Sequence, residues 1–257
     1  MSFLTFGISV QCKNKEHINQ DRFGSITVKT PSGKEVLVAA VADGVSMCFR
    51  GELASYNAVR FVLNWAGAYF SANNFDTEEI PYEFDKLITS INQTLNHHAR
   101  TKNKKKPQAG YSPFSSTTLS CAITDGDKIL YFNIGDSGIY ELKAYSTTNV
   151  TVKSTHTNTS GRLTSYVGGI DDDKLDIIYI ESDFDNSAAY FLCTDGMSNR
   201  IVFDSDTDED FRKFNQRLLL ANSKDNGVTV LEGMVEHVRS KGETDDITAL
   251  VIKGGNA

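Results

Sequence analysis

The chain has 257 residues, of which 40% are hydrophobic and 23% are charged, and its formal net charge is −7. This composition is typical of a globular protein with a substantial core, and it excludes wholesale disorder, collagen-like repeats and coiled-coil arrays. The acidic balance lacks the broad basic field that binds nucleic acid, so no nucleic-acid partner is expected.

The distribution of apolar and cysteine residues disfavours a membrane protein and a disulfide-rich secreted protein. No apolar run approaches the roughly 20 residues that span a bilayer, so no membrane association is expected. The start, MSFLTFGISVQCKNKE, lacks a basic leader followed by an apolar segment and a cleavage site, which predicts a cytoplasmic protein. The four cysteines have no CxxC spacing, and we expect them to be reduced thiols.

Hydrophobic periodicity predicts the elements in chain order. Strands are expected over residues 3–11, 23–30 and 36–42, followed by amphipathic helices over residues 52–70 and 82–100. Strands return over residues 117–124, 128–134, 139–142, 175–181 and 188–194, with Asp125-Gly126 as a hairpin turn. Helices near residues 210–221 and 228–240 precede a last strand over residues 247–252. This order predicts one domain over residues 1–257, an α+β fold in which a four-layer α/β/β/α sandwich has two central antiparallel sheets.

Aspartates stand at the ends of the predicted strands. Three of them follow apolar strands directly, and two begin strands: Asp43, Asp136 and Asp195 in the first group, and Asp21 and Asp245 in the second. In antiparallel sheets the end of one strand and the start of its neighbour share an edge, so one rim could hold all five. The alternative is that these are ordinary turn residues, because Asp-Gly is a common turn dipeptide.

Five carboxylates at one rim would repel each other unless cations neutralise them. The ligands would all be oxygens, which favours Mg²⁺ or Mn²⁺ over Zn²⁺. Gly44, directly after Asp43, would let the backbone approach an ion and offer its carbonyl oxygen.

The order of short motifs resembles that of a known family. The chain contains NQD at 19–21, VADG at 41–44, SSTTL at 115–119, NIGDSGIYEL at 133–142, TSYVGG at 164–169, CTDG at 193–196 and DDIT at 245–248. Together they resemble the metal-dependent protein phosphatases, the type 2C serine/threonine phosphatase family. The resemblance covers residues 19–248, nearly the whole chain, and implies the same sandwich fold.

The resemblance also implies roles for individual residues. Asp43 resembles the carboxylate that bridges two metal ions, and Gly44 the carbonyl ligand beside it. Asp195 and Asp245 resemble the other ligands of the first ion, Asp21 serves the second, and Asp136 belongs to a third metal site that some members use. Thr117 and Thr118 match a supporting pair behind the site. The implied chemistry is phosphomonoester hydrolysis by a water that the two Mg²⁺ or Mn²⁺ ions activate, with Asp43 and Asp195 catalytic through that water.

The chain departs from the family pattern in the shell that grips substrate. Glu16 stands where many members carry a phosphate-binding Arg, and Lys13, Lys15 and His17 are the nearby candidates, although each reads equally well as a solvated loop residue. The segment after Gly44 contains no His to act as a proton donor.

Two functional hypotheses follow from these observations. The first is a monomeric serine/threonine phosphatase acting on a phosphorylated protein substrate, which could be one dedicated regulatory protein. The second is a catalytically weak or inactive phosphatase-like module that binds and regulates a partner, a reading that the missing Arg motivates.

Overall fold

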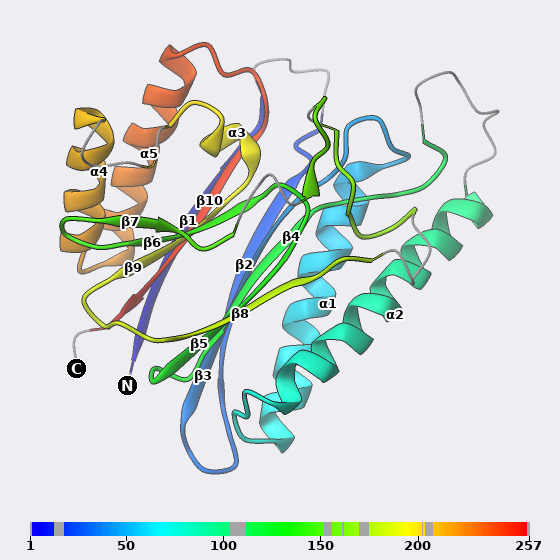
Figure 1. Cartoon of the computed structure of the whole chain (residues 1–257), viewed down its shortest axis with the longest axis horizontal. Helices are drawn as coiled ribbons and strands as arrows, with labels where there is room; N and C mark the ends of the chain where they lie inside the picture. The colour runs from blue at the N-terminus through cyan, green and yellow to red at the C-terminus, as the bar shows by residue number, and fades with distance from the viewer. Residues whose placement is uncertain are drawn as a thin grey trace.

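A computed structural model describes residues 2–12, 18–102, 112–151, 156–160, 162–169, 175–201, 203 and 208–255. Two five-stranded antiparallel sheets lie face to face at its centre (Figure 1). The first sheet has the order β1 (Phe3–Val10), β10 (Ile247–Gly254), β9 (Ala189–Cys193), β6 (Gly138–Leu142) and β7 (Thr147–Asn149). The second has the order β2 (Asp21–Lys29), β3 (Glu35–Asp43), β4 (Leu119–Thr124), β5 (Lys128–Ile134) and β8 (Ile178–Asp183).

Helices cover the outer face of each sheet (Figure 1). The second sheet packs against α1 (Gly51–Ala72) and α2 (Glu79–Lys102), and the first packs against α4 (Glu209–Leu220) and α5 (Lys224–Ser240). The arrangement is helices, sheet, sheet, helices, which confirms the predicted four-layer α+β sandwich. Within the described ranges, no helix combines the length and apolar character that crossing a membrane requires.

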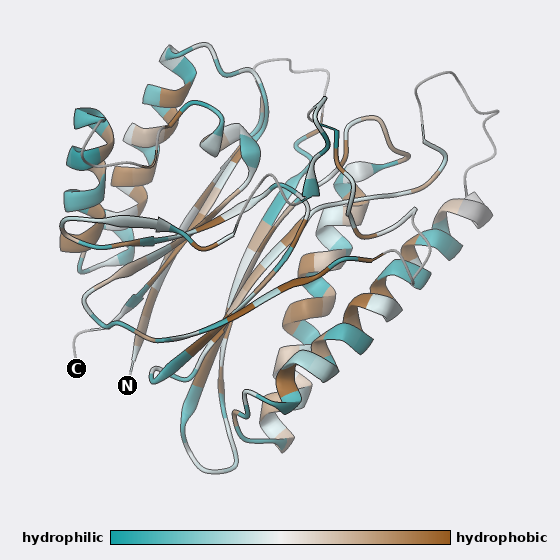
Figure 2. Ribbon diagram, viewed as in Figure 1, coloured by the Kyte–Doolittle hydropathy of each residue, from teal (hydrophilic) through white to brown (hydrophobic). Residues whose placement is uncertain are grey.

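Three clusters of buried apolar residues lie between neighbouring layers. In Figure 2 the hydrophobic colour falls mainly on the central strands and on parts of the helices that cover them. The strand β3 shows why: its residues from Val36 to Ala42 are all buried, because one face meets α1 and α2 and the other meets the opposite sheet. A strand covered on both faces reads as a continuous apolar run rather than an alternating one. This burial fixes β3, and therefore the position of Asp43 at its end.

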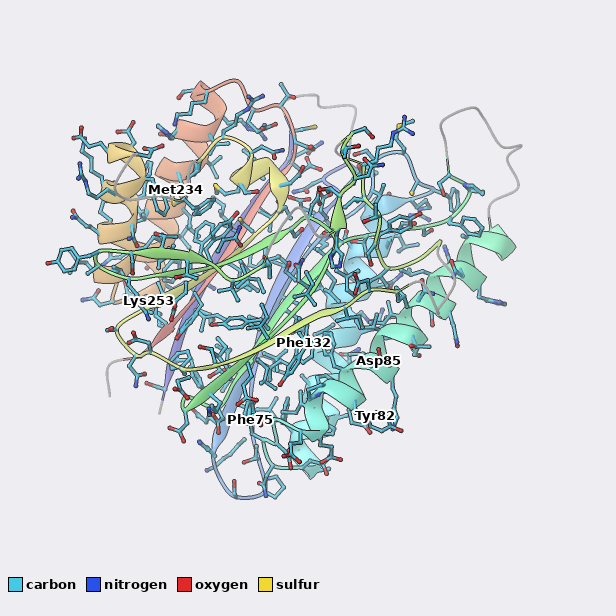
Figure 3. All side chains as sticks on the ribbon, viewed as in Figure 1. Phe75, Tyr82, Asp85, Phe132, Met234 and Lys253 are labelled. Carbon is cyan, nitrogen blue, oxygen red and sulfur yellow. The ribbon has the colours of Figure 1, made fainter. Side chains whose placement is uncertain are left out.

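Aromatic contacts hold α2 on the second sheet. Phe132 of β5, labelled in Figure 3, stacks on Phe84 of α2 with ring centroids 4.0 Å apart. Phe84 also meets Trp65 of α1 edge to face at 5.8 Å. Tyr82 and Asp85, also labelled in Figure 3, lie on the same helix, with 63% of Tyr82 exposed. The helix therefore turns one apolar face to the sheet and leaves the other in solvent.

The structure differs from the predicted elements mainly at their ends. The strands β2 and β3 include Asp21 and Asp43, because the two residues pair with each other in the register of the sheet. The helix α5 begins at Lys224, four residues earlier than predicted, because the Ser223 side chain caps it by accepting the Asn226 N–H. Two short elements were not predicted, β7 and the single turn α3 (Asp195–Ser198). The predicted hairpin turn at Asp125-Gly126 is confirmed, and Gly126 has a φ of 90° there.

Candidate active site

Two of the strand-end aspartates face each other on neighbouring strands of the second sheet. Asp21, the first residue of β2, is the register partner of Asp43, the last residue of β3. The Asp43 N–H donates to Thr118 Oγ1 at 2.9 Å, and the Asp43 carbonyl oxygen accepts from Thr118 N–H and from Thr117 Oγ1, both at 2.8 Å. Both threonines are buried. They hold the backbone of Asp43, which agrees with the supporting role that the motif comparison implies.

The other three aspartates come from the first sheet. Cys193 of β9 pairs with Ala249 of β10 and with Gly138 of β6. This register brings the residues just after β9, before β10 and before β6 to the same end of the sheet. Those residues are Asp195, Asp245 and Asp136. The helix α3, which begins at Asp195, marks this end of the sandwich and lies in the upper part of Figure 1.

A cleft of about 610 Å³ opens where these strand ends meet, and Asp43, Asp136, Asp195 and Asp245 line it together with Thr118. Asp21 is not among the residues that line this cleft, because it is only 1% exposed beside Asp43 on the neighbouring strand. Its Oδ2 accepts a hydrogen bond of 2.7 Å from Thr194 Oγ1, which joins the second sheet to the end of β9 in the first. One cleft therefore receives four of the five aspartates, and the fifth supports it from within.

Burial and mutual repulsion make these carboxylates hard to ionise without a counter-charge. Burial raises the pKa of Asp21 to about 7, against the opposing effect of the Thr194 hydroxyl. The pKa of Asp43 lies well above its usual range, first because of burial and then because of Asp21 and Asp195. The pKa of Asp245 is raised by burial and by the neighbouring Asp195. Such a cluster favours whatever brings positive charge to it.

That positive charge does not come from described basic side chains. Among the described residues, no Lys, Arg or His forms an ion pair with Asp21, Asp43, Asp195 or Asp245. Carboxylates and a backbone carbonyl are the oxygen ligands that Mg²⁺ and Mn²⁺ prefer, so this donor set suits such ions. In the conformation described, no three His, Cys, Asp or Glu side chains of the described segments converge closely enough to hold a metal ion. Ion binding therefore needs small side-chain rotations or water ligands, and Mg²⁺ usually keeps several waters.

Two glycines allow the backbone to close around this end of the sandwich. A Cβ on Gly44 would lie 2.3 Å from the backbone of Gly51, so the loop 45–50 returns to its starting point only because residue 44 has no side chain. A Cβ on Gly196 would lie 1.9 Å from the carbonyl oxygen of Asp246. These close approaches explain why Gly follows the aspartate in both Asp43-Gly44 and Asp195-Gly196. The reason is the lack of space for a side chain.

Three supporting residues escaped the sequence-based reasoning. Thr194 ends the strand before Asp195, and nothing in its spacing points to the hydrogen bond with Asp21. Asp246 turns away from the cleft, and its two carboxylate oxygens accept the N–H groups of Cys12 at 2.6 Å and Gln20 at 2.7 Å. Glu243, 6% exposed, accepts the N–H groups of Thr244 and Asp245 and pairs with Arg200 at 3.2 Å. The acidic run from 243 to 246 was the one available signal, but it does not say which carboxylate faces the cleft.

The predicted phosphate contacts Lys13, Lys15 and His17 lie outside the described residues, as does Glu16. The segment 45–50, which lacks the expected His, forms one wall of the cleft with Met47 and Cys48. Its backbone is held by the segment 112–116, for example through Ser112 N–H to the Met47 carbonyl at 2.7 Å.

Comparisons with known proteins agree on one family. The model of the family described as Protein phosphatase 2C matches residues 10–236. Among curated proteins, none matches this chain. Among solved structures, the serine/threonine phosphatase Stp1 of Staphylococcus aureus superposes with a TM-score of 0.69 at 17% identity, covering 98% of this chain and 95% of that one.

Two further solved structures have the same fold over their whole length. PppA of Pseudomonas aeruginosa gives a TM-score of 0.70 at 18% identity and 98% coverage of both chains. The serine/threonine phosphatase PstP/Ppp of Mycobacterium tuberculosis gives 0.68 at 15% identity and 99% coverage of both. The resemblance drawn from the motifs is thereby confirmed: with a family match that spans most of its length, the chain belongs to the protein phosphatase 2C family of serine/threonine phosphoprotein phosphatases, which are metal-dependent.

Proposed function

We propose that this protein hydrolyses phosphoserine and phosphothreonine in a protein substrate, and that it requires Mg²⁺ or Mn²⁺ bound at the aspartate-lined cleft. The observation that carries the proposal is the convergence of Asp43, Asp136, Asp195 and Asp245 on one cleft without ion pairs from described basic residues to Asp43, Asp195 or Asp245. Carboxylates that raise each other's pKa are a costly arrangement unless cations bind there.

The position of each carboxylate suggests its role toward the ions. Asp43 lines the cleft and is the register partner of the buried Asp21, so it would be the residue that holds both ions, with the Gly44 carbonyl as a further ligand. Asp195 and Asp245 would complete the first ion's ligands, Asp21 would serve the second, and Asp136 would serve a third if one binds. When bound, such ions lower the pKa of a water molecule toward neutrality and offset negative charge on the phosphoryl oxygens.

The thiol in the wall of the cleft is a poor nucleophile for this reaction. Cys48 lies in the wall of the cleft, but burial raises the pKa of its thiol, with weaker opposing effects from Ser116 and Ser112. A protonated thiol does not attack phosphorus, so a phosphocysteine intermediate is not expected. This supports direct attack by water and agrees with the absence of a nucleophile from the motif pattern.

Turnover of p-nitrophenyl phosphate and of matched phosphoserine, phosphothreonine and phosphotyrosine peptides tests the proposal. We expect activity with Mn²⁺ or Mg²⁺, none in EDTA, and a loss of at least about 100-fold in Asp43→Asn and Asp195→Asn, since metal sites supply several kcal/mol of transition-state stabilisation. Asp183→Asn is the matched control, because its side chain is 87% exposed at the end of β8 and pairs only on the surface.

Calorimetric titration with Mn²⁺ separates the phosphatase from the phosphatase-like binding module. Metal binding and tight phosphopeptide binding without turnover on any substrate would favour the module. Failure of the wild-type protein to bind Mn²⁺ at all would refute the metal site. The monomeric state, the cytoplasmic location and the single domain stay predictions, and size-exclusion chromatography tests the first.

A further inference from the structure

The acidic cleft has a basic side chain at its edge. Among the described residues that line it, Arg162 is the cationic one, and its neighbours Leu163 and Tyr166 line the same cleft. Arg162 is exposed. A guanidinium in this place could be an ordinary solvated surface group or a contact for an anionic ligand, and three observations favour the ligand.

First, the backbone that carries Arg162 is held in a tight turn. The Asn158 side-chain oxygen accepts the N–H groups of Arg162 and Ser160, both at 3.0 Å, and the Asn158 N–H donates to the Arg162 carbonyl at 2.9 Å. Just outside this turn, Thr157 and Leu163 form a β-bridge. The backbone position from which the Arg162 side chain extends is thereby fixed before any ligand binds, so binding needs to order only the side chain.

Second, the same segment is anchored to the scaffold on its far side. The Gly168 N–H donates to Asn92 Oδ1 of α2 at 2.7 Å, and the Gly169 N–H donates to Asn96 Oδ1 at 2.5 Å. A Cβ on Gly168 would lie 2.0 Å from the Ser115 carbonyl oxygen, so the chain passes closely over the segment 115–118 that precedes β4. The segment that follows Arg162 is therefore held close to Asp43, because Thr117 pairs with Val167 and donates to the Asp43 carbonyl oxygen.

Third, Arg162 has no carboxylate partner among the described residues, although it lines the same cleft as four aspartates. Elsewhere in the described chain, arginines near carboxylates do pair, as Arg200 does with Glu243 and Arg50 with Glu52. The five N–H donors of Arg162 are thus not engaged by the carboxylates that would bind the ions. An arginine fork matches the oxygens of a phosphate group, which a lysine does not.

We propose that Arg162 binds the phosphoryl oxygens of the substrate's phosphate group and thereby fixes the phosphate in the metal-lined cleft. This inference rests on the proposed phosphatase function, since it assigns a substrate contact within that site. A phosphomonoester dianion entering a cleft lined by carboxylates meets repulsion, and Arg162 offsets part of it at the rim while the ions offset it at the base. It competes with the sequence-based candidates Lys13, Lys15 and His17 for the same role.

The test compares Arg162→Ala and Arg162→Lys with the wild-type protein loaded with Mn²⁺. Arg217→Ala is the matched control, because it removes one exposed arginine from α4, away from the cleft. Three quantities are measured: KM and kcat for p-nitrophenyl phosphate and for a phosphoserine peptide, the inhibition constant of inorganic phosphate, and the rise in melting temperature that inorganic phosphate causes.

We expect Arg162→Ala to raise KM for both substrates and the inhibition constant of phosphate by about tenfold, which corresponds to one charged hydrogen bond, with kcat nearly unchanged. Arg162→Lys should have KM values and an inhibition constant between those of the wild type and of Arg162→Ala. The phosphate-induced rise in melting temperature should be smaller in Arg162→Ala than in the wild type. Arg217→Ala should match the wild type in all three measurements.

Unchanged KM and inhibition constants in Arg162→Ala would overturn the inference, as would a rise confined to the peptide, which would place Arg162 against the polypeptide instead of the phosphate. A tenfold effect in Lys13→Ala or Lys15→Ala together with none in Arg162→Ala would assign the contact to the N-terminal segment. If the wild-type protein shows no turnover, the proposed function fails, and the phosphate-induced shift in melting temperature still decides whether Arg162 binds phosphate.

Discussion

The Asp21→Asn substitution should make the metal-free protein more stable at alkaline pH while weakening its response to metal. Asp21 is 1% exposed, and its Oδ2 accepts the Thr194 hydroxyl at 2.7 Å. An asparagine keeps the size of the side chain and an oxygen acceptor for Thr194. It removes the charge that burial and the neighbouring Asp246 disfavour.

The magnitude follows from the pKa of Asp21, which is raised from 3.8 to about 7 in the folded protein. Each pKa unit corresponds to 1.36 kcal/mol, so ionising Asp21 in the metal-free fold costs about 4 kcal/mol. The amide N–H groups of an asparagine need hydrogen-bond partners in the same place, and leaving them unsatisfied reduces the gain in stability by about 1–2 kcal/mol. We therefore expect a net gain of about 2 kcal/mol in the free energy of unfolding above pH 7.

The sign of the pH dependence follows by linkage. Between pH 3.8 and 7 the folded state binds more protons at Asp21 than the unfolded state does, so the stability contributed by this group falls as pH rises through that window. The wild-type protein in EDTA should lose about 3 kcal/mol from this group between pH 5 and pH 8. Asp21→Asn should lack that loss, so the two proteins should be similar at pH 5 and differ at pH 8.

Urea denaturation in EDTA at pH 5, 6, 7 and 8 measures these differences, with Asp183→Asn as the exposed control. Addition of Mn²⁺ at pH 8 should stabilise the wild-type protein more than Asp21→Asn, because a ligand stabilises only the state that binds it. The reasoning is refuted if Asp21→Asn is less stable than the wild type at pH 8, or if both proteins lose stability equally between pH 5 and pH 8.

Two further substitutions test the supports of the site. Thr194→Val removes the hydroxyl that donates to Asp21 Oδ2 and accepts the Thr248 N–H at 3.0 Å. It should lower the free energy of unfolding, measured by urea denaturation, by about 2 kcal/mol. A change within about 0.5 kcal/mol would show that these hydrogen bonds contribute nothing. Gly196→Ala places a Cβ 1.9 Å from the Asp246 carbonyl oxygen, and should cost about 1–3 kcal/mol and most of the Mn²⁺-dependent turnover. Gly227→Ala is the control, because its Cβ would lie 2.4 Å from the Phe6 ring, away from the cleft. It should destabilise the protein by a similar amount but keep its turnover when folded. Equal losses of activity in the two glycine variants would contradict this reasoning.

The sequence predicted the layers well, because buried strands and helix faces consist of apolar residues in recognisable patterns. The run VLVAAVA over residues 36–42 predicted a strand covered on both faces, and the structure buries every residue of it. The amphipathic patterns of α1 and α2 predicted helices on one side of a sheet, and their apolar faces do pack there. Short elements such as α3 and β7 carry no such trace, because three or four residues contain too little periodicity to distinguish them from a turn.

The candidate site was predictable only in part, for a similar reason. Aspartates at the ends of apolar strands are visible in the sequence, and the register of antiparallel pairs then brings them to one end. Which oxygen faces the cleft is not visible: Asp245 lines it, whereas the adjacent Asp246 binds the backbone at Cys12 and Gln20. The placement of Arg162 depends on a turn that Asn158 holds, and side-chain hydrogen bonds to a turn leave no periodic signal.

The sequence by itself determined the strand and helix pattern, the acidic strand ends and the family, because hydrophobic periodicity and motif order are local properties of the chain. Only the tertiary structure decided that Asp21 is buried beside Asp43 and accepts the hydroxyl of Thr194, and that Arg162 lines the same cleft as four aspartates. The hydrogen bond between Asp21 and Thr194 joins residues 173 positions apart, and the geometry of the cleft depends on how two sheets pack and twist against each other, which no short segment specifies.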